Sequence, residues 1–151
     1  MQLLATITAA AGLLASASAL PASNTNEDSA YTWQVSEWEA GCGRSGCYYY
    51  FNVTGAASDK KTAFKAYCHG TDEGYFTPCD LLSGAEGTGV AAELATYNDT
   101  VAKMGVSLQF TTDAKTPVTY NYTGHYNATY NQFASPVYGF TVKPEEVSAV
   151  A

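Results

Sequence analysis

Charged side chains are missing from the start of the chain, where none occurs before Glu27. The stretch from Leu3 to Ala19 is almost wholly apolar or small, and it ends in the small-x-small pattern ASA. It is short and interrupted by Thr, Gly and Ser, unlike a membrane span, and no later segment approaches membrane length. Although no Lys or Arg precedes the apolar core, the pattern predicts a secretory signal peptide over residues 1–19.

Basic residues are scarce as well. The chain has 7 Lys and Arg against 14 Asp and Glu, a net charge of −7. An acidic protein is repelled by nucleic-acid phosphates and by anionic membranes. We therefore expect no nucleic-acid and no membrane partner, and an extracellular location suits this charge.

Leucine is rare, with only Leu81, Leu82, Leu94 and Leu108 after residue 30, whereas Tyr occurs 12 times. Tyr and Thr favour strands, and helical bundles need Leu and Ala. Short runs with strand patterning recur over residues 31–143, separated by turn residues. They predict one all-β domain, an antiparallel barrel or sandwich of about seven to nine strands, with a flexible leader at 20–30 and a loose tail at 144–151.

The first three strands have distinct inner and outer faces. Alternation places one set of side chains inward: Tyr31, Trp33, Val35, Tyr49, Phe51, Val53, Phe64 and Ala66. The outward set on the second strand is Tyr48, Tyr50, Asn52 and Thr54. Segment 88–97 fits helix or strand, and Gly87 and Gly89 with the following Asn-Asp favour strand. Later strands are expected at 106–112, 116–124, 125–131 and 136–143.

Four cysteines follow the signal peptide: Cys42, Cys47, Cys68 and Cys79. Their spacing lacks the C-x2-C knuckle of common zinc sites and the C-x-x-C of redox dithiols, so neither a metal site nor a cofactor is expected. An even number in a secreted chain indicates two disulfides. Cys42 and Cys47 would face each other across a hairpin whose glycines allow a tight ring, leaving Cys68–Cys79 to close an acidic loop. The two crossed pairings stay open.

Four Asn-x-Thr sequons agree with secretion and mark candidate N-glycosylation sites at Asn52, Asn98, Asn121 and Asn127. The outward register of Asn52 suits a glycan acceptor.

A small hydrolase could be assembled from the residues present. Secreted ribonucleases use His, Glu, Arg and Tyr around a phosphate, and the chain offers His69 or His125, Glu37 or Glu39, and Arg44. No motif links these residues, and no G-x-S-x-G elbow is present. We therefore interpret the histidines as exposed side chains and expect no enzyme, because function must be argued from a site.

Three segments resemble the fungal allergen and elicitor family typified by the major allergen of Alternaria. They are YTWQVSEWEA, YYYFNVTG and FKAYCHGTDEGYFTPC, which place the family's patterns at Tyr31–Trp38, Phe51–Val53 and Phe64–Cys79. The resemblance covers about half of the chain after the signal peptide. It implies a secreted β-barrel, often dimeric, that acts as an allergen or an elicitor of plant defence rather than as an enzyme.

The resemblance also implies the pairing Cys68–Cys79. The family's C-terminal cysteine pair is missing here, and Cys42–Cys47 is additional. No cysteine lies between the signal peptide and Tyr31 to bridge two copies, so a non-covalent homodimer is the form to expect.

These observations predict a secreted effector or elicitor that acts by binding a host extracellular protein or a small aromatic ligand. Exposed tyrosines suit this role, since they offer contact area at low entropic cost. The predicted binding surface comprises Arg44, Tyr48, Tyr50, His69, Asp72, Glu73 and Tyr75. The alternatives are a ribonuclease-like hydrolase and a structural cell-wall protein.

Overall fold

The computed structural model describes residues 31–58, 61–97, 100–132 and 138–150. The predicted signal peptide, the leader and the Asn98 sequon lie outside these residues. The strands are β1 Trp33–Gly43, β2 Gly46–Gly55, β3 Phe64–Thr71, β4 Thr77–Pro78, β5 Asp80–Ser83, β6 Gly89–Leu94, β7 Ala102–Thr111, β8 Thr119–Ala128, β9 Tyr138–Val142 and β10 Pro144–Val150. No helix that could cross a membrane occurs in the described ranges.

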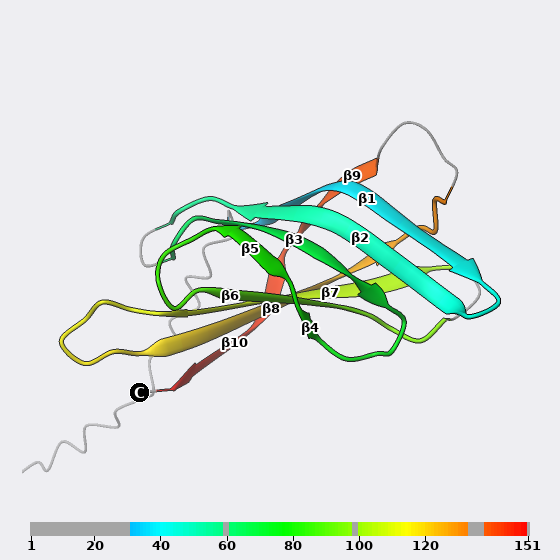
Figure 1. Cartoon of the computed structure of the whole chain (residues 1–151). Coiled ribbons are helices and arrows are strands. Elements are labelled where there is room, and N and C mark those ends of the chain that lie inside the picture. The colour runs from blue at the N-terminus through cyan, green and yellow to red at the C-terminus, as the bar shows by residue number, and fades with distance from the viewer. Residues whose placement is uncertain (1–30, 59–60, 98–99, 133–137, 151) are drawn as a thin grey trace, which may run out of the picture.

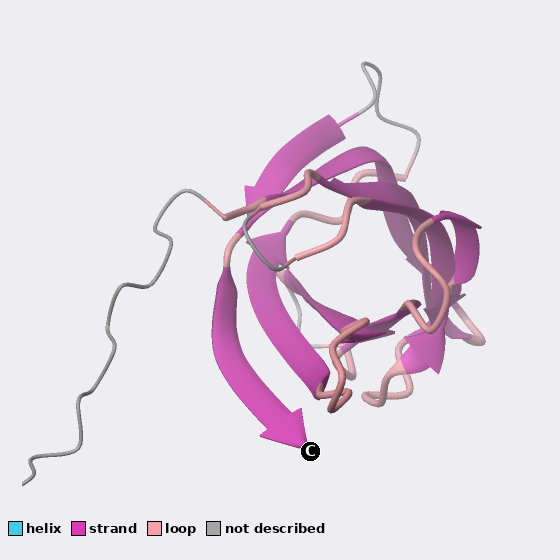
Figure 2. Ribbon diagram, turned by 90° about the vertical axis from the view of Figure 1, so that its left-hand side faces the viewer, coloured by secondary structure: helices cyan, strands magenta, loops and turns pink. Residues whose placement is uncertain are grey.

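The strands form two antiparallel five-stranded sheets that lie one over the other (Figure 1). The first sheet has the order β5-β3-β2-β1-β9, and the second has the order β10-β8-β7-β6-β4. Both sheets curve around a shared interior (Figure 2). The predicted antiparallel sandwich is confirmed, whereas the closed barrel is not, because each sheet keeps its own edge strands among the described residues.

The inner faces of both sheets supply the core, as the alternation predicts. Tyr49, Phe51 and Val53 on β2 are at most 2% exposed. They meet an opposing set from the second sheet that includes Leu94, Val106 and Leu108. The Tyr49 hydroxyl donates a 3.0 Å hydrogen bond to the Ala92 carbonyl on β6, so a polar contact joins the two layers inside the core.

Two sequence expectations about the C-terminal half are wrong. The segments 116–124 and 125–131 were predicted as separate strands, but β8 runs unbroken from Thr119 to Ala128 because all ten residues of β7 pair with it. Gly124 is not a turn residue. A Cβ at Gly124 would lie 2.7 Å from the Lys143 carbonyl oxygen, so close packing requires glycine there.

The predicted loose tail at 144–151 is also a strand over residues 144–150. β10 pairs with β8 from Pro144↔Gly124 to Val150↔Thr119. The free edge of β8 offers unpaired backbone groups, and these bind a segment whose small and polar sequence carries no alternation signal.

Candidate functional site

A β-bulge in β1 shapes the outer face of the first sheet. The register of β1 with β2 shifts between Ser36 and Glu39, and Glu37 has φ = 55°, which is unusual for a residue other than glycine. The extra residue breaks the alternation of the strand. As a result Trp38 turns inward and is 1% exposed, while Glu37 and Glu39 both point outward.

Each of the two carboxylates accepts hydrogen bonds from β2. Glu39 accepts one from the Tyr48 hydroxyl at 3.0 Å and another from the Tyr50 hydroxyl. Glu37 accepts one from the side-chain amide of Asn52. Without the bulge, alternation would place both glutamates on the inner face with Trp33 and Val35. The bulge therefore turns both of them outward, toward one row of outward β2 side chains.

These side chains enclose a hollow of about 280 Å³, which we call the tyrosine–glutamate hollow. Its lining residues are Glu37, Trp38, Glu39, Tyr50, Asn52, Tyr67 and Asn131. Further rings adjoin it, since Tyr48 stacks on Tyr50 with centroids 6.2 Å apart and His69 lies 5.5 Å from Tyr67. An aromatic surface thus extends over β2 and β3 beside the two carboxylates.

Asn131, which follows β8, holds the bulge in place. Its amide nitrogen donates to the Trp38 carbonyl at 2.7 Å, and its side-chain oxygen accepts from the Ala40 backbone N–H at 3.0 Å. The Trp38 indole donates to the Thr129 carbonyl at 2.9 Å. These bonds pair backbone groups at and beside the bulge with residues that follow β8, so they pre-organise the floor of the hollow.

Burial and hydrogen bonds to Glu39 raise the pKa of both outward tyrosines, Tyr48 and Tyr50. The bond from Tyr50 to the Glu39 carboxylate, with partial burial and the glutamate charge, raises the pKa of Tyr50 to about 12. Burial, and then the bond to Glu39, raises the pKa of Tyr48 as well. Both hydroxyls therefore stay protonated at any extracellular pH and act as donors to Glu39.

Arg44, Glu73 and Tyr75 are exposed in loops at one end of the sandwich, and Tyr75 is 58% exposed. The predicted disulfide Cys42–Cys47 is confirmed, and its cysteines are paired in the β1–β2 hairpin that carries Arg44.

Asp72, the other predicted loop contact, supports this hairpin. Its carboxylate accepts the Cys47 backbone N–H at 3.0 Å and the Tyr97 backbone N–H at 3.3 Å. The carboxylate thereby joins the hairpin to the loop after β6.

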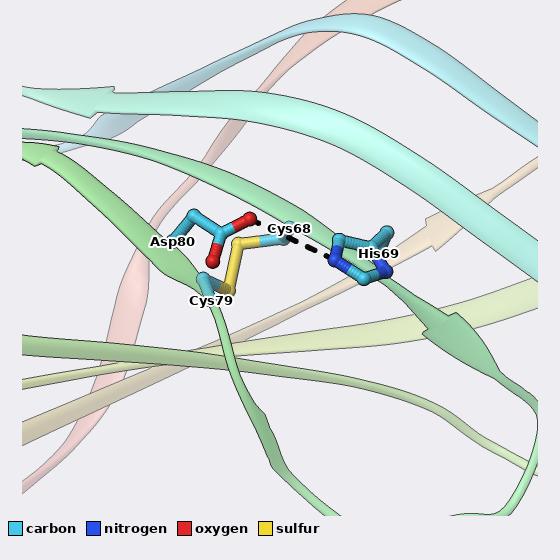
Figure 3. A network of polar contacts seen from close by, with 4 residues as sticks. All are labelled: Cys68, His69, Cys79 and Asp80. Atoms are coloured by element: carbon cyan, nitrogen blue, oxygen red, sulfur yellow. Dashed lines mark ion pairs between the residues drawn. A yellow bond between two sulfur atoms is a disulfide. The ribbon is translucent and has the colours of Figure 1, made fainter.

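The second predicted disulfide, Cys68–Cys79, is also confirmed, which excludes the crossed pairings. The neighbouring residues His69 and Asp80 form an ion-pair contact of 3.7 Å beside it (Figure 3). Both side chains are more than half exposed, so the contact is a surface pair of small energetic weight.

The two histidines do not share a site. His69 is on the outer face of the first sheet, whereas His125 is an exposed β8 residue that contacts Glu93 of β6 at 3.5 Å. Within the described ranges, no three His, Cys, Asp or Glu side chains are grouped as a metal site would require.

The sequons differ in their surroundings. Asn52 lines the tyrosine–glutamate hollow, and its amide nitrogen, the atom that a glycan would modify, faces Glu37. Asn121 and Asn127 are exposed on β8, where the Asn121 side-chain oxygen accepts a hydrogen bond from Ser107.

Two larger hollows, of about 540 and 530 Å³, lie elsewhere on the sandwich. The first is lined mostly by small residues from β1, β2 and the loop at 56–58, and the second by loop residues beside Phe110 and Tyr120. Neither combines paired carboxylates, tyrosines and amides. The tyrosine–glutamate hollow is therefore the candidate site. Binding sites typically combine aromatic walls with a small number of convergent polar groups.

Tyr48, Tyr50 and His69 were predicted to lie on the binding surface, whereas Glu37 and Glu39 were candidates only for acid–base chemistry. Trp38, Tyr67 and Asn131 were not predicted as site residues. The available signal was the spacing of Trp33, Val35 and Trp38, which departs from period two at SEWE.

No family model matches this chain, and neither a curated protein nor a solved structure matches it. The fold and the geometry of the site are therefore the grounds for assigning a function.

Proposed function

We propose that this chain is a secreted elicitor-like effector, similar to the fungal allergen and elicitor family, and that it acts by binding rather than by catalysis. Two disulfides favour an oxidising compartment. The predicted signal peptide and the four sequons agree with a secreted glycoprotein. The partner is a host extracellular protein or a small ligand. The chain binds it as a monomer or as a non-covalent homodimer.

One observation carries this proposal. On the outer face of the first sheet, Tyr50 and Tyr67 line a hollow whose two glutamates accept hydrogen bonds from β2 side chains, and Tyr48 stacks on Tyr50 beside it. The bulge that carries these glutamates is held by Asn131. Tyrosines on a rigid sheet provide contact area with little loss of conformational entropy. Glu37 retains a disfavoured backbone conformation, and such strain is common at functional sites.

The test is infiltration of purified, disulfide-bonded protein into leaf tissue, with an oxidative burst and cell death as readouts. Reduced and alkylated protein serves as the control for contaminants. We expect a response to the native protein alone. An absent response to native protein, together with unchanged host colonisation after gene deletion, would contradict the proposal.

The rival function is a ribonuclease-like hydrolase. It is favoured by His69 lying beside Tyr67 and opposite Tyr50 in the β2–β3 pair, but His125 lies on the other sheet. RNA cleavage by the wild type, His69→Ala and His125→Ala separates the two functions. Cleavage that is lost in either variant would establish the hydrolase and displace our proposal.

A further inference from the structure

We propose that the tyrosine–glutamate hollow binds an alkylammonium group, the chemistry shared by a lysine side chain and a polyamine. This inference rests on the proposed binding function and names the ligand class of the same site. It is carried by a cavity in which carboxylates and aromatic faces converge, and each of these features favours a cation.

The charged groups that line the hollow are all acidic. Glu37 and Glu39 both line the hollow, and none of its seven lining residues, all in the described part of the chain, is basic. The nearest lysine along β3, Lys65, is exposed two positions from Tyr67 and does not line the hollow. The hollow therefore repels anions and attracts cations, in a chain whose net charge is already −7.

The walls of the hollow include aromatic rings. Tyr50 and Tyr67 contribute aromatic side chains, and an ammonium group over an aromatic face is stabilised by the ring quadrupole. The alkyl chain behind the ammonium can pack on the same rings. A volume of about 280 Å³ is below that of typical drug-sized sites, so it suits a short chain rather than a fused-ring ligand.

A neutral ligand fits the hollow less well than a cation does. A neutral molecule seated in the hollow would remove water from two carboxylates without supplying a counter-charge, which is costly. The Tyr48 and Tyr50 hydroxyls at Glu39 and the Asn52 amide at Glu37 offset only part of this cost, because they leave the charge itself in place. An ammonium group supplies both the missing charge and up to three N–H donors.

The test uses disulfide-bonded protein produced without N-glycans and monitored by NMR of its backbone amides. The probes are n-butylammonium and its neutral isostere n-butanol, at low ionic strength. Spermidine and the peptide acetyl-Gly-Lys-Gly-amide then compare the two sources of the group. The variants are Glu37→Gln/Glu39→Gln and the charge-matched control Glu86→Gln/Glu93→Gln.

We expect n-butylammonium to shift the amides of β1–β3 around the hollow with a dissociation constant on the order of 1 mM. We expect the affinity to fall at least about tenfold in Glu37→Gln/Glu39→Gln and to persist in the control, and n-butanol to bind at least about tenfold more weakly than n-butylammonium. Tighter binding of the peptide would assign a protein lysine, and tighter binding of spermidine would assign a free polyamine.

The inference is overturned if n-butanol binds as well as n-butylammonium, if Glu37→Gln/Glu39→Gln retains wild-type affinity, or if no ammonium probe shifts these amides. Leaf infiltration separates this failure from failure of the proposed function. A wild type that elicits a response but binds no ammonium probe would overturn the ligand class alone.

Discussion

The Tyr50 hydroxyl on β2 donates a hydrogen bond to the carboxylate of Glu39, the residue directly opposite it on β1. This cross-strand pair lies beyond a bulge that shifts the register, so it forms only because one extra residue is present in β1. The pair joins a neutral phenol to a charged carboxylate and defines one wall of the tyrosine–glutamate hollow.

The first prediction concerns the ionisation of Tyr50. Because the bond to Glu39 is the main cause of its raised pKa, Glu39→Gln should lower that pKa from about 12 toward the ordinary value of about 10. NMR of the tyrosine ring carbons between pH 9 and pH 12.5 measures this directly. Glu93→Gln is the matched control, and an unchanged pKa of Tyr50 in Glu39→Gln would show that the bond is not formed in solution.

The second prediction concerns the strained backbone at the bulge. Glu37 has φ = 55°, a region that glycine adopts without cost and that costs other residues roughly 1–2 kcal/mol. Both Glu37→Gly and Glu37→Ala remove the carboxylate, so their comparison isolates the backbone. We expect Glu37→Gly to be more stable than Glu37→Ala by about 1 kcal/mol in urea unfolding. Equal stabilities would mean that the bulge relaxes.

The third prediction concerns alkaline stability. Burial, followed by the charge of Glu93, raises the pKa of Tyr49 to about 12 in the folded state. The unfolded chain releases this proton near pH 10, so the folded state binds more protons between about pH 10 and 12. Stability should be fully present below pH 10 and fall as the pH rises toward 12.

The matching variant is Tyr49→Phe, which has no proton to lose. It should cost about 1–2 kcal/mol at pH 7, because the buried Ala92 carbonyl loses its donor, but its stability should fall less steeply above pH 10. Urea unfolding at pH 7, 10 and 11.5 measures both effects. If the free energy of unfolding of Tyr49→Phe fell with pH as steeply as that of the wild type, the alkaline loss of stability would come from other tyrosines.

The fourth prediction concerns the sequon at Asn52. A glycan on its amide nitrogen would stand at the hollow and exclude other ligands, because that nitrogen contacts Glu37. Protein from a glycosylating host should therefore bind n-butylammonium only in the fraction that mass spectrometry finds unmodified at Asn52. Thr54→Ala removes the sequon and should restore full binding. Equal binding by the modified fraction would place the ammonium site elsewhere.

Much of the fold could be predicted from the sequence, because local patterns determine it. The alternation of Tyr49, Phe51 and Val53 with outward neighbours requires a strand with one buried face, and hairpin geometry favours the pairing Cys42–Cys47. The residues alone left the crossed pairings open, and the family resemblance implied Cys68–Cys79. β10 could not be predicted in this way. It pairs with the open edge of β8, and the sequence of residues 144–151 carries no information about that edge.

The candidate site was predictable only in part. The outward tyrosines of β2 follow from period two, but the bulge at Glu37 depends on bonds from Asn131, a residue more than 90 positions away. Such a long-range clamp leaves no local signal. For the same reason, alternation alone would place Glu37 and Glu39 on the inner face, whereas the bulge turns both of them outward.

On our proposal, the protein acts through the tyrosine–glutamate hollow. The most direct measurement is the dose of protein that triggers an oxidative burst in infiltrated leaves, compared among the wild type, Glu37→Gln/Glu39→Gln and Glu86→Gln/Glu93→Gln, after thermal unfolding has shown all three to be folded. We expect the first pair of substitutions to raise the required dose at least about tenfold and the second to leave it unchanged. A wild-type dose response from Glu37→Gln/Glu39→Gln would contradict it.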